Sequence, residues 1–408
     1  MKYTEIKGGV TAPQGFLAGA VYAGIKDPNA KSEKPDVAVI YSETPCASAA
    51  CFTKNKFCAA PVLLGREVLK TGTAQAIVIN SGNANAATGE QGIKDAKAIE
   101  EAAEKLLGLG ADDVFVCSTG VIGKRLPYER VIKGVEMIVP TLNKEQGTDA
   151  AWAIMTTDTV KKEASYELEL SGGTVRIGAM AKGSGMIHPN MATMLAYVTT
   201  DVKTDASVLQ PMLSAAVDKS FNMMTVDGDT STNDSIFLLA NGASGVELKT
   251  EEDKEAFAEL VEAICIDMTR RMASDGEGAT HLIEVEAYGL PTEHDARLVA
   301  KSIAGSSLFK AAVFGRDANW GRIMAAAGYS GADVDPTNAD CYLKSDAGTI
   351  QVMEAGFGLD FDEDLALKIL TEHDITVIVR FYQGDGEAKA WGCDLTYDYV
   401  KINGDYRT

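Results

Sequence analysis

The chain has 408 residues, and 58 Asp and Glu against 38 Lys and Arg give it a formal charge of −20 at pH 7. Its apolar content of 46% excludes an intrinsically disordered protein. The acidic balance argues against a nucleic-acid partner, which would need a basic surface. No apolar run is long enough to predict a membrane span.

In chain order, β-type runs rich in Val, Ile and aromatic residues alternate with amphipathic stretches. We predict strands at 36–42 and 76–80, a helix at 92–107, strands at 113–117, 166–170 and 174–180, a helix at 205–220, a strand at 235–240, a helix at 251–272, a strand at 281–287, a helix at 295–302 and a strand at 375–381. This mixture predicts an α/β or α+β architecture in which helices cover sheets. Internal repeats and an obvious linker are absent from the sequence.

Seven cysteines are scattered through the chain without a CxxC pair. Free thiols and an N-terminus without a signal-like apolar stretch predict a cytoplasmic protein. The four histidines lie far apart, so we expect no metal site and no Ser-His-Asp triad.

Clusters of Gly, Asn, Ser and Thr interrupt the alternation, and such loops between strands often carry functional sites. None of them has the order of a P-loop, a dinucleotide-binding GxGxxG or a GxSxG elbow. The loop that begins at Asp227 starts like a calcium loop but has Thr232 and Leu238 where Gly and Glu are needed.

A threonine becomes a nucleophile most simply as the first residue of a chain, where its own α-amine acts as the base. The segment PNMATML (189–195) offers such a residue, because the small Ala192 precedes Thr193 and an apolar run follows. By spacing alone, this segment equally predicts a turn that leads into a buried strand.

The stretch KGSGMIHPNMATMLAYVTTD (182–201) resembles the signature of the ornithine acetyltransferases, the glutamate N-acetyltransferases of arginine biosynthesis. Other segments match in the same order: INSGNANAATG, STGVIG, MTTDT, FNMMTVDGDTSTND, DGEGATHL, FGRDANWGRI and the terminal NGDYRT. The resemblance covers essentially the whole chain. It implies an α/β fold of the DmpA type, a helix-sheet-sheet-helix sandwich with a smaller second α/β domain and the site at the junction of the two domains.

The resemblance also implies that the precursor cleaves itself between Ala192 and Thr193. The products are an α chain (1–192) and a β chain (193–408), usually assembled as α2β2. Residues 1–192 hold as many acidic as basic side chains, so the β chain would carry the whole charge of −20. Thr193 then takes the acetyl group of N2-acetylornithine and passes it to glutamate, in a ping-pong reaction without a cofactor.

Site residues follow motif by motif from the resemblance. Thr119 and Gly120 of STGVIG are expected to form the oxyanion hole. The residues expected to contact substrate are Thr156, Lys182, Thr193, Glu277, Asn403 and Thr408. Lys182 would pair with a substrate carboxylate and Glu277 with an ammonium group, whereas His188 is expected to be a turn residue.

Three alternatives stay open at this stage. One is the acetyltransferase, one is a self-processing aminopeptidase or amidase of the DmpA type, and one is a metabolite-binding protein on the same scaffold. The sequence also leaves open whether acetyl-CoA serves as a second acetyl donor.

Overall fold

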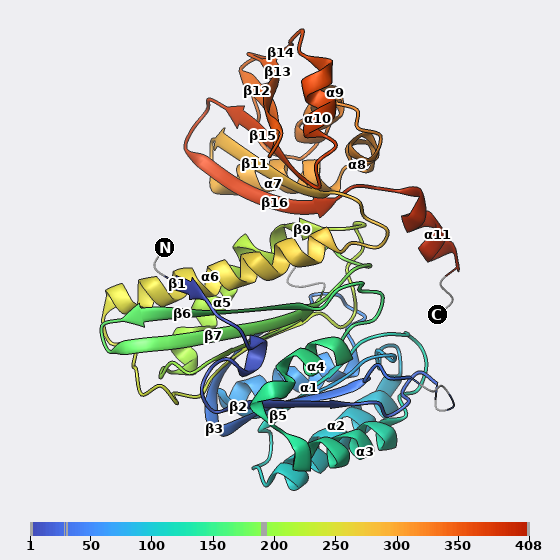
Figure 1. The fold of residues 1–408 in the computed structure, drawn as a ribbon, viewed down its shortest axis with the longest axis vertical. Helices are drawn as coiled ribbons and strands as arrows, with labels where there is room; N and C mark the ends of the chain where they lie inside the picture. Colours follow the sequence, from blue (N-terminus) through green and yellow to red (C-terminus); the bar gives the residue numbers. More distant parts are fainter. Residues whose placement is uncertain (1–2, 28, 30–31, 189–193, 406–408) are drawn as a thin grey trace.

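The computed structural model describes residues 3–27, 29, 32–188 and 194–405. Within these ranges the chain forms a nine-stranded and a seven-stranded sheet, which lie in two bodies joined along helix α6 (Glu251–Ser274; Figure 1). The larger sheet has the order β1-β6-β7-β8-β10-β3-β4-β5, with β2 paired to β3. The smaller has the order β14-β13-β12-β15-β11-β16-β9.

The strands of the larger sheet are β1 (Tyr3–Glu5), β2 (Phe16–Val21), β3 (Val37–Phe52), β4 (Thr73–Asn80), β5 (Val114–Ser118), β6 (Lys162–Leu170), β7 (Gly173–Lys182), β8 (Leu195–Thr200) and β10 (Ser235–Ala240). Its helices are α1 (Ala60–Val68), α2 (Gly89–Leu107), α3 (Tyr128–Ile138), α4 (Gly147–Ala153), α5 (Ala206–Lys219) and α6. The smaller sheet is built from β9 (Met224–Thr225), β11 (Leu282–Leu290), β12 (Ala339–Ser345), β13 (Gly348–Glu354), β14 (Phe357–Gly358), β15 (Asp374–Phe381) and β16 (Gly386–Cys393). It is accompanied by α7 (Glu293–Gly305), α8 (Ser307–Phe314), α9 (Trp320–Gly328), α10 (Glu363–Ile369) and the C-terminal α11 (Tyr397–Asp405).

The larger sheet folds over itself to make two layers. Phe115 on β5 and Phe237 on β10 have ring centroids 4.7 Å apart, although β3 and β4 separate their strands in the sheet. Neighbouring strands are about 4.8 Å apart, so the two rings can meet only if the two halves face each other. Tyr197 on β8 stacks on the same Phe237 ring. An apolar core therefore fills the space between the two halves of the sheet.

Helices cover the two outer faces of this sandwich. On one side, alternate residues of β4 such as Val78 pack with the apolar stripe Ala96, Ile99 and Ala103 of α2. On the other side, Val198 of β8 packs among residues of α5 and α6. The result is the predicted helix-sheet-sheet-helix order, with the second α/β body beside it, so the predicted fold class is confirmed.

The described elements overlap all the strands and helices predicted from the sequence. The predicted end of the first strand at Ser42 was wrong, because β3 continues to Phe52. Pro45 lies where the pairing of β3 with β4 shifts register between Tyr41 and Cys46. A bulge tolerates a proline inside a strand, so Pro45 marks the bend between the two halves of the sheet.

The predicted chain boundary and the structural boundary do not coincide. Ala192 and Thr193 lie outside the described residues, between β7 and β8, which pair antiparallel with Lys182 opposite Leu195. Both predicted chains would therefore supply strands to the larger sheet, whereas all seven strands of the smaller sheet come from residues after 193. Among the described residues, we find no helix with the length and apolar character needed to cross a membrane.

Candidate active site

The turn after β5 carries the predicted oxyanion pair. Thr119 is nine-tenths buried, and its backbone N–H donates to the carbonyl of Asn80 (3.0 Å). Gly120 has φ +131°, a conformation that favours glycine. A Cβ atom there would lie 2.4 Å from the carbonyl carbon of Gly82, so the close approach of the two loops also requires glycine.

An asparagine network holds this turn in place. Ser118 donates its hydroxyl to Asn80 Oδ1 (2.7 Å), and Asn80 Nδ2 donates to the carbonyl of Asn83 (2.9 Å). Asn233 Nδ2 donates to the carbonyls of Ala84 and Ser118 (2.5 and 2.8 Å). These amides satisfy buried carbonyl groups of the loop and of the end of β5. The Asn-rich loop 80–89 thus supports the Thr119–Gly120 turn.

A cavity of about 310 Å³ opens beside the turn. Gly120 and Thr156 both line it, together with Lys26, Lys34 and Asp36. Lys34 Nζ donates to the carbonyl of Met155 (2.6 Å), which ties the loop before β3 to the loop that carries Thr156. The cavity therefore combines two predicted site residues with cationic side chains.

Lys182, at the end of β7, donates through Nζ to Thr156 Oγ1 (2.8 Å). Lys182 is nine-tenths buried, and its Nζ lies 3.9 Å from Asp158 Oδ2. Burial lowers the pKa of Lys182, and the nearby carboxylates of Asp158, Asp234 and Glu277 partly oppose that shift. The structure thus joins two residues, Thr156 and Lys182, that the sequence predicts to contact substrate.

A buried ion cluster lies behind this pair. Lys162 Nζ is 2.7 Å from Asp158 Oδ1 and 2.5 Å from Asp275 Oδ2, and all three side chains are at least nine-tenths buried. Burial alone would raise the pKa of Asp158, but the ammonium groups of Lys182 and Lys162 outweigh it and hold that pKa below its ordinary range. Asp158 also accepts from the backbone N–H of Gly183 (2.7 Å). The cluster therefore fixes the residues that flank Lys182.

Lys162→Met should destabilise the protein by about 3–5 kcal/mol, because it leaves the buried Asp158 and Asp275 without their shared cation. Urea unfolding at pH 7 measures the loss. Since the pKa of Asp158 is lowered in the folded state, its contribution is present at neutral pH and fades only below about pH 4. Lys161→Met, at the exposed neighbouring lysine, is the matched control. Equal unfolding midpoints for the two variants would contradict the role of the cluster.

Glu277 and Asn403 also meet. Asn403 Nδ2, on α11, donates to Glu277 Oε2 (2.8 Å). The backbone N–H of Glu277 donates to the carbonyl of Ser184 (2.9 Å), so this loop lies against the turn that follows Lys182. The carboxyl group of Glu277 lies close over Gly185: a Cβ there would come within 2.4 Å of it, so a larger residue at position 185 would push the Glu277 side chain aside. Thr408 lies outside the described residues.

His188 ends the described run before the predicted cleavage site. Its Nδ1 lies 3.0 Å from Thr225 Oγ1. Burial first, and the charge of Lys301 second, lower the pKa of His188 to about 4, so its ring is neutral at pH 7. Asp227 accepts from the backbone N–H groups of Met186 and Ile187 (2.6 and 2.8 Å) and shapes this loop.

The structure therefore gathers Thr119, Gly120, Thr156 and Lys182 around one region and pairs Glu277 with Asn403. Their catalytic and binding roles stay predictions. The sequence analysis missed the partners that hold the site, Lys162 and Lys34 above all. Asp158 and Asp275 were visible in the MTTDT and DGEG motifs, but no spacing indicated that Lys162 would join them across 113 residues of chain. Among the described residues, no group of three or more His, Cys, Asp and Glu side chains could hold a metal ion.

These features define a two-body α/β protein in which a glycine turn and a buried Thr156–Lys182 pair lie beside one polar cavity of the sandwich. Comparison with known proteins identifies the family. The chain belongs to the ArgJ family, whose model matches residues 17–408.

Relatives match the chain from end to end. The arginine biosynthesis bifunctional protein ArgJ of Symbiobacterium thermophilum is 52% identical over 405 residues, covering 99% of both chains. The protein of the same name from Bacillus subtilis is 45% identical, covering 99% of this chain and 98% of its own. The crystal structure of the Bacillus halodurans ArgJ protein is 45% identical with a TM-score of 0.50, covering 52% of this chain and all of that one.

Proposed function

We propose that the protein is a self-processed acyltransferase that moves the acetyl group of N2-acetylornithine to glutamate through an acetyl ester of Thr193. The products are ornithine and N-acetylglutamate, and acetyl-CoA serves as a second donor. The end-to-end match with bifunctional ArgJ proteins of arginine biosynthesis carries this proposal. The cavity shared by Gly120 and Thr156 supports it.

The first step prepares the nucleophile. The Thr193 hydroxyl attacks the carbonyl carbon of Ala192, the C–N bond between the two residues breaks, and an ester links Ala192 to Thr193 Oγ. Water then hydrolyses this ester, which leaves a free amine and a free hydroxyl on Thr193. Met194, which is bonded to Thr193, is buried, and its carbonyl accepts from the backbone N–H of Ser235 (2.9 Å), so hydrogen bonding to β10 begins one residue after the nucleophile.

The second step is acetyl transfer. Thr193 Oγ attacks the acetyl carbonyl of N2-acetylornithine while the α-amine of Thr193 takes the hydroxyl proton and returns it to the leaving amine. The Thr119 hydroxyl and the Gly120 N–H are the proposed donors to the oxyanion. Glutamate then attacks the acetyl ester through its amine, and Thr193 is regenerated.

Substrate recognition needs groups that suit an amino acid. Lys182, held by Thr156, pairs with a substrate carboxylate. Glu277, held by Asn403, pairs with an ammonium group, and Thr408 is the remaining proposed contact. We also propose an α2β2 assembly of processed chains in the cytoplasm, and a reaction that needs no cofactor.

The decisive experiment compares N2-acetylornithine with and without glutamate. We expect a burst of one ornithine per site without glutamate and continuous turnover with it, because the acetyl ester accumulates until an acceptor arrives. Continuous release of ornithine and acetate that ignores glutamate would identify the DmpA-type amidase instead. A stable uncut chain without turnover would favour a metabolite-binding protein.

Lys182→Met should raise KM for N2-acetylornithine by about 10- to 100-fold, because it removes a buried cation that we place against the substrate carboxylate. Steady-state kinetics at saturating glutamate measure the change. Lys203→Met, at an exposed lysine paired with Glu247, is the control. An unchanged KM in a folded Lys182→Met protein would remove Lys182 from the site.

A further inference from the structure

Helix α7 presents a basic face. His294, Arg297 and Lys301 are spaced three and four residues apart, so they share one side of the helix. The opposite side, with Val299 and Ile303 among others, is buried in the core of the smaller body. The three basic side chains therefore lie on the face of α7 that points away from the core of the smaller body.

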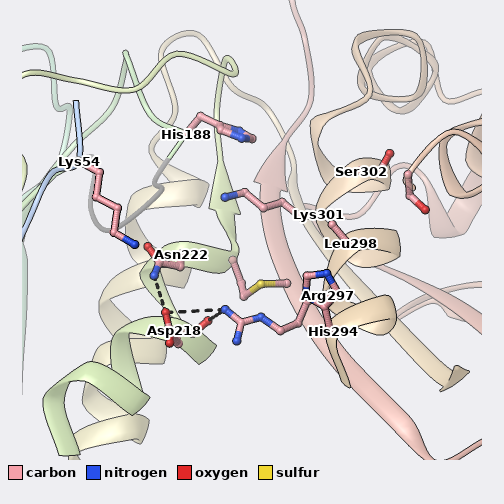
Figure 2. Close-up of a pocket in the computed structure, with 11 residues that line it drawn as sticks. Lys54, His188, Asp218, Asn222, His294, Arg297, Leu298, Lys301 and Ser302 are labelled. Carbon is pink, nitrogen blue, oxygen red and sulfur yellow. Dashed lines mark hydrogen bonds and ion pairs between the residues drawn. The ribbon is translucent and has the colours of Figure 1, made fainter. Parts of the chain in front are cut away.

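This basic face forms one wall of a cleft of about 550 Å³. Figure 2 shows Lys54 reaching in from the larger body while Lys301 points toward it from α7. His188 and Asn222 complete the wall on the side of the larger body. The volume lies within the range of sites that bind cofactor-sized molecules.

The side chains that line the cleft are mainly cationic, although the chain as a whole is acidic. Asp218 is the single carboxylate among its lining residues, against the cations Lys54, Arg297 and Lys301. Asp218 is already engaged, because Asn222 Nδ2 donates to its carboxylate (2.7 Å) and Arg297 Nη2 lies 3.9 Å from it. A chain with a net charge of −20 thus collects cations in one cavity, which favours an anionic ligand.

The lowered pKa of Lys301 is consistent with the cationic lining of the cleft. Burial first, and the neighbouring Arg297 second, lower the pKa of Lys301 to about 8. A bound anion would oppose both effects and stabilise the ammonium form. A cationic ligand such as free arginine would be repelled, whereas a phosphate ester would meet Lys54 on one side and α7 on the other.

We propose that this cleft binds the phosphate groups of acetyl-CoA, the second donor of the proposed reaction. The inference rests on the proposed function, and it assigns the phosphate end of the donor to a cleft whose lining shares no residue with the cavity beside Gly120, while the acetyl end must reach Thr193. N2-acetylornithine carries no phosphate, so the two donors should depend on different side chains.

Three variants test the assignment. Lys54→Glu reverses a charge at an exposed position and should not disturb the fold. Arg297→Gln removes the central cation of α7, and Lys249→Glu, at an exposed lysine outside the cleft, is the matched control. Calorimetry with coenzyme A should show affinity reduced by about 10-fold or more in the two cleft variants and unchanged in the control. Inorganic pyrophosphate should compete with coenzyme A for the wild-type protein.

Kinetics separate this inference from the proposed function. We expect KM for acetyl-CoA to rise by about 10-fold in Lys54→Glu while KM for N2-acetylornithine stays within twofold. No coenzyme A binding by the wild-type protein, or equal binding by wild-type and cleft variants, would overturn the assignment. If the wild-type protein transferred acetyl from neither donor, the proposed function would fail, and the binding measurement would still decide what the cleft holds.

Discussion

Thr193→Ala is expected to leave the 408-residue chain uncut and to lower acetyl transfer by about 10⁴-fold or more, since both steps use the Thr193 hydroxyl. Denaturing electrophoresis shows processing as two bands in the wild-type protein and one in the variant. Mass spectrometry after incubation with N2-acetylornithine should find an acetyl group on the β chain of the wild-type protein alone.

The matched control is Thr193→Ser, which keeps a hydroxyl and an α-amine after cleavage. It should still be processed and should transfer acetyl, although more slowly. Normal turnover by Thr193→Ala would exclude Thr193 as the nucleophile. If Thr193→Ser stayed uncut but transferred acetyl at the wild-type rate, catalysis would not require cleavage of the chain.

Gly120→Ala is expected to reduce kcat by about 10²- to 10³-fold, as when an oxyanion donor is lost. The new Cβ would lie 2.4 Å from the carbonyl carbon of Gly82 and 2.6 Å from the backbone nitrogen of Asn83. Neither backbone atom can yield without moving the loop, so the turn must shift. We expect self-cleavage to slow as well, because it passes through the same kind of tetrahedral intermediate. Rates of processing and of ornithine release measure both effects.

Gly123→Ala provides the control within the same loop. Gly123 also has a positive φ (+79°), but no atom lies within 4 Å of a Cβ built there. The substitution should cost about 1–3 kcal/mol of stability through backbone strain and leave kcat nearly unchanged. If the two variants lost kcat equally, backbone strain alone would explain the loss, and the close approach of Gly120 to Gly82 would not be needed for activity.

Much of the fold was predictable because its strands and helices have strong local patterns. The helix at α2 follows from apolar residues at helical spacing, and α6 from Thr250, whose side chain accepts from the N–H of Asp253. The path of β3 was not predictable, because Pro45 reads locally as a stop. Only pairing with β4 and β10 shows that the strand bends and continues.

The site was predictable as a set of motifs but not as a structure. The sequence placed Thr156 and Lys182 in separate loops, and only the fold brings them within hydrogen-bonding distance. The Asp158–Lys162–Asp275 cluster depends on long-range packing, which no local pattern encodes. The sequence marked the Asn-rich loop 80–89 as a candidate functional loop, but not as a support for the Gly120 turn. That support appears only in the structure, where Asn80 accepts from the Ser118 hydroxyl and Asn233 donates to the Ser118 carbonyl.

The adjacency of β7 and β8 has a consequence for refolding. In the proposed processed protein these strands belong to different chains, yet they pair from Ile177 with Thr200 to Lys182 with Leu195 in the interior of one sheet. The chains could separate only if that sheet came apart, so subunit exchange and global unfolding would be the same event. The precursor folds as a unimolecular reaction, whereas denatured mature chains must first find each other. The covalent connection is thus needed once, during assembly, and the mature enzyme should recover from denaturation with a yield that depends on its concentration.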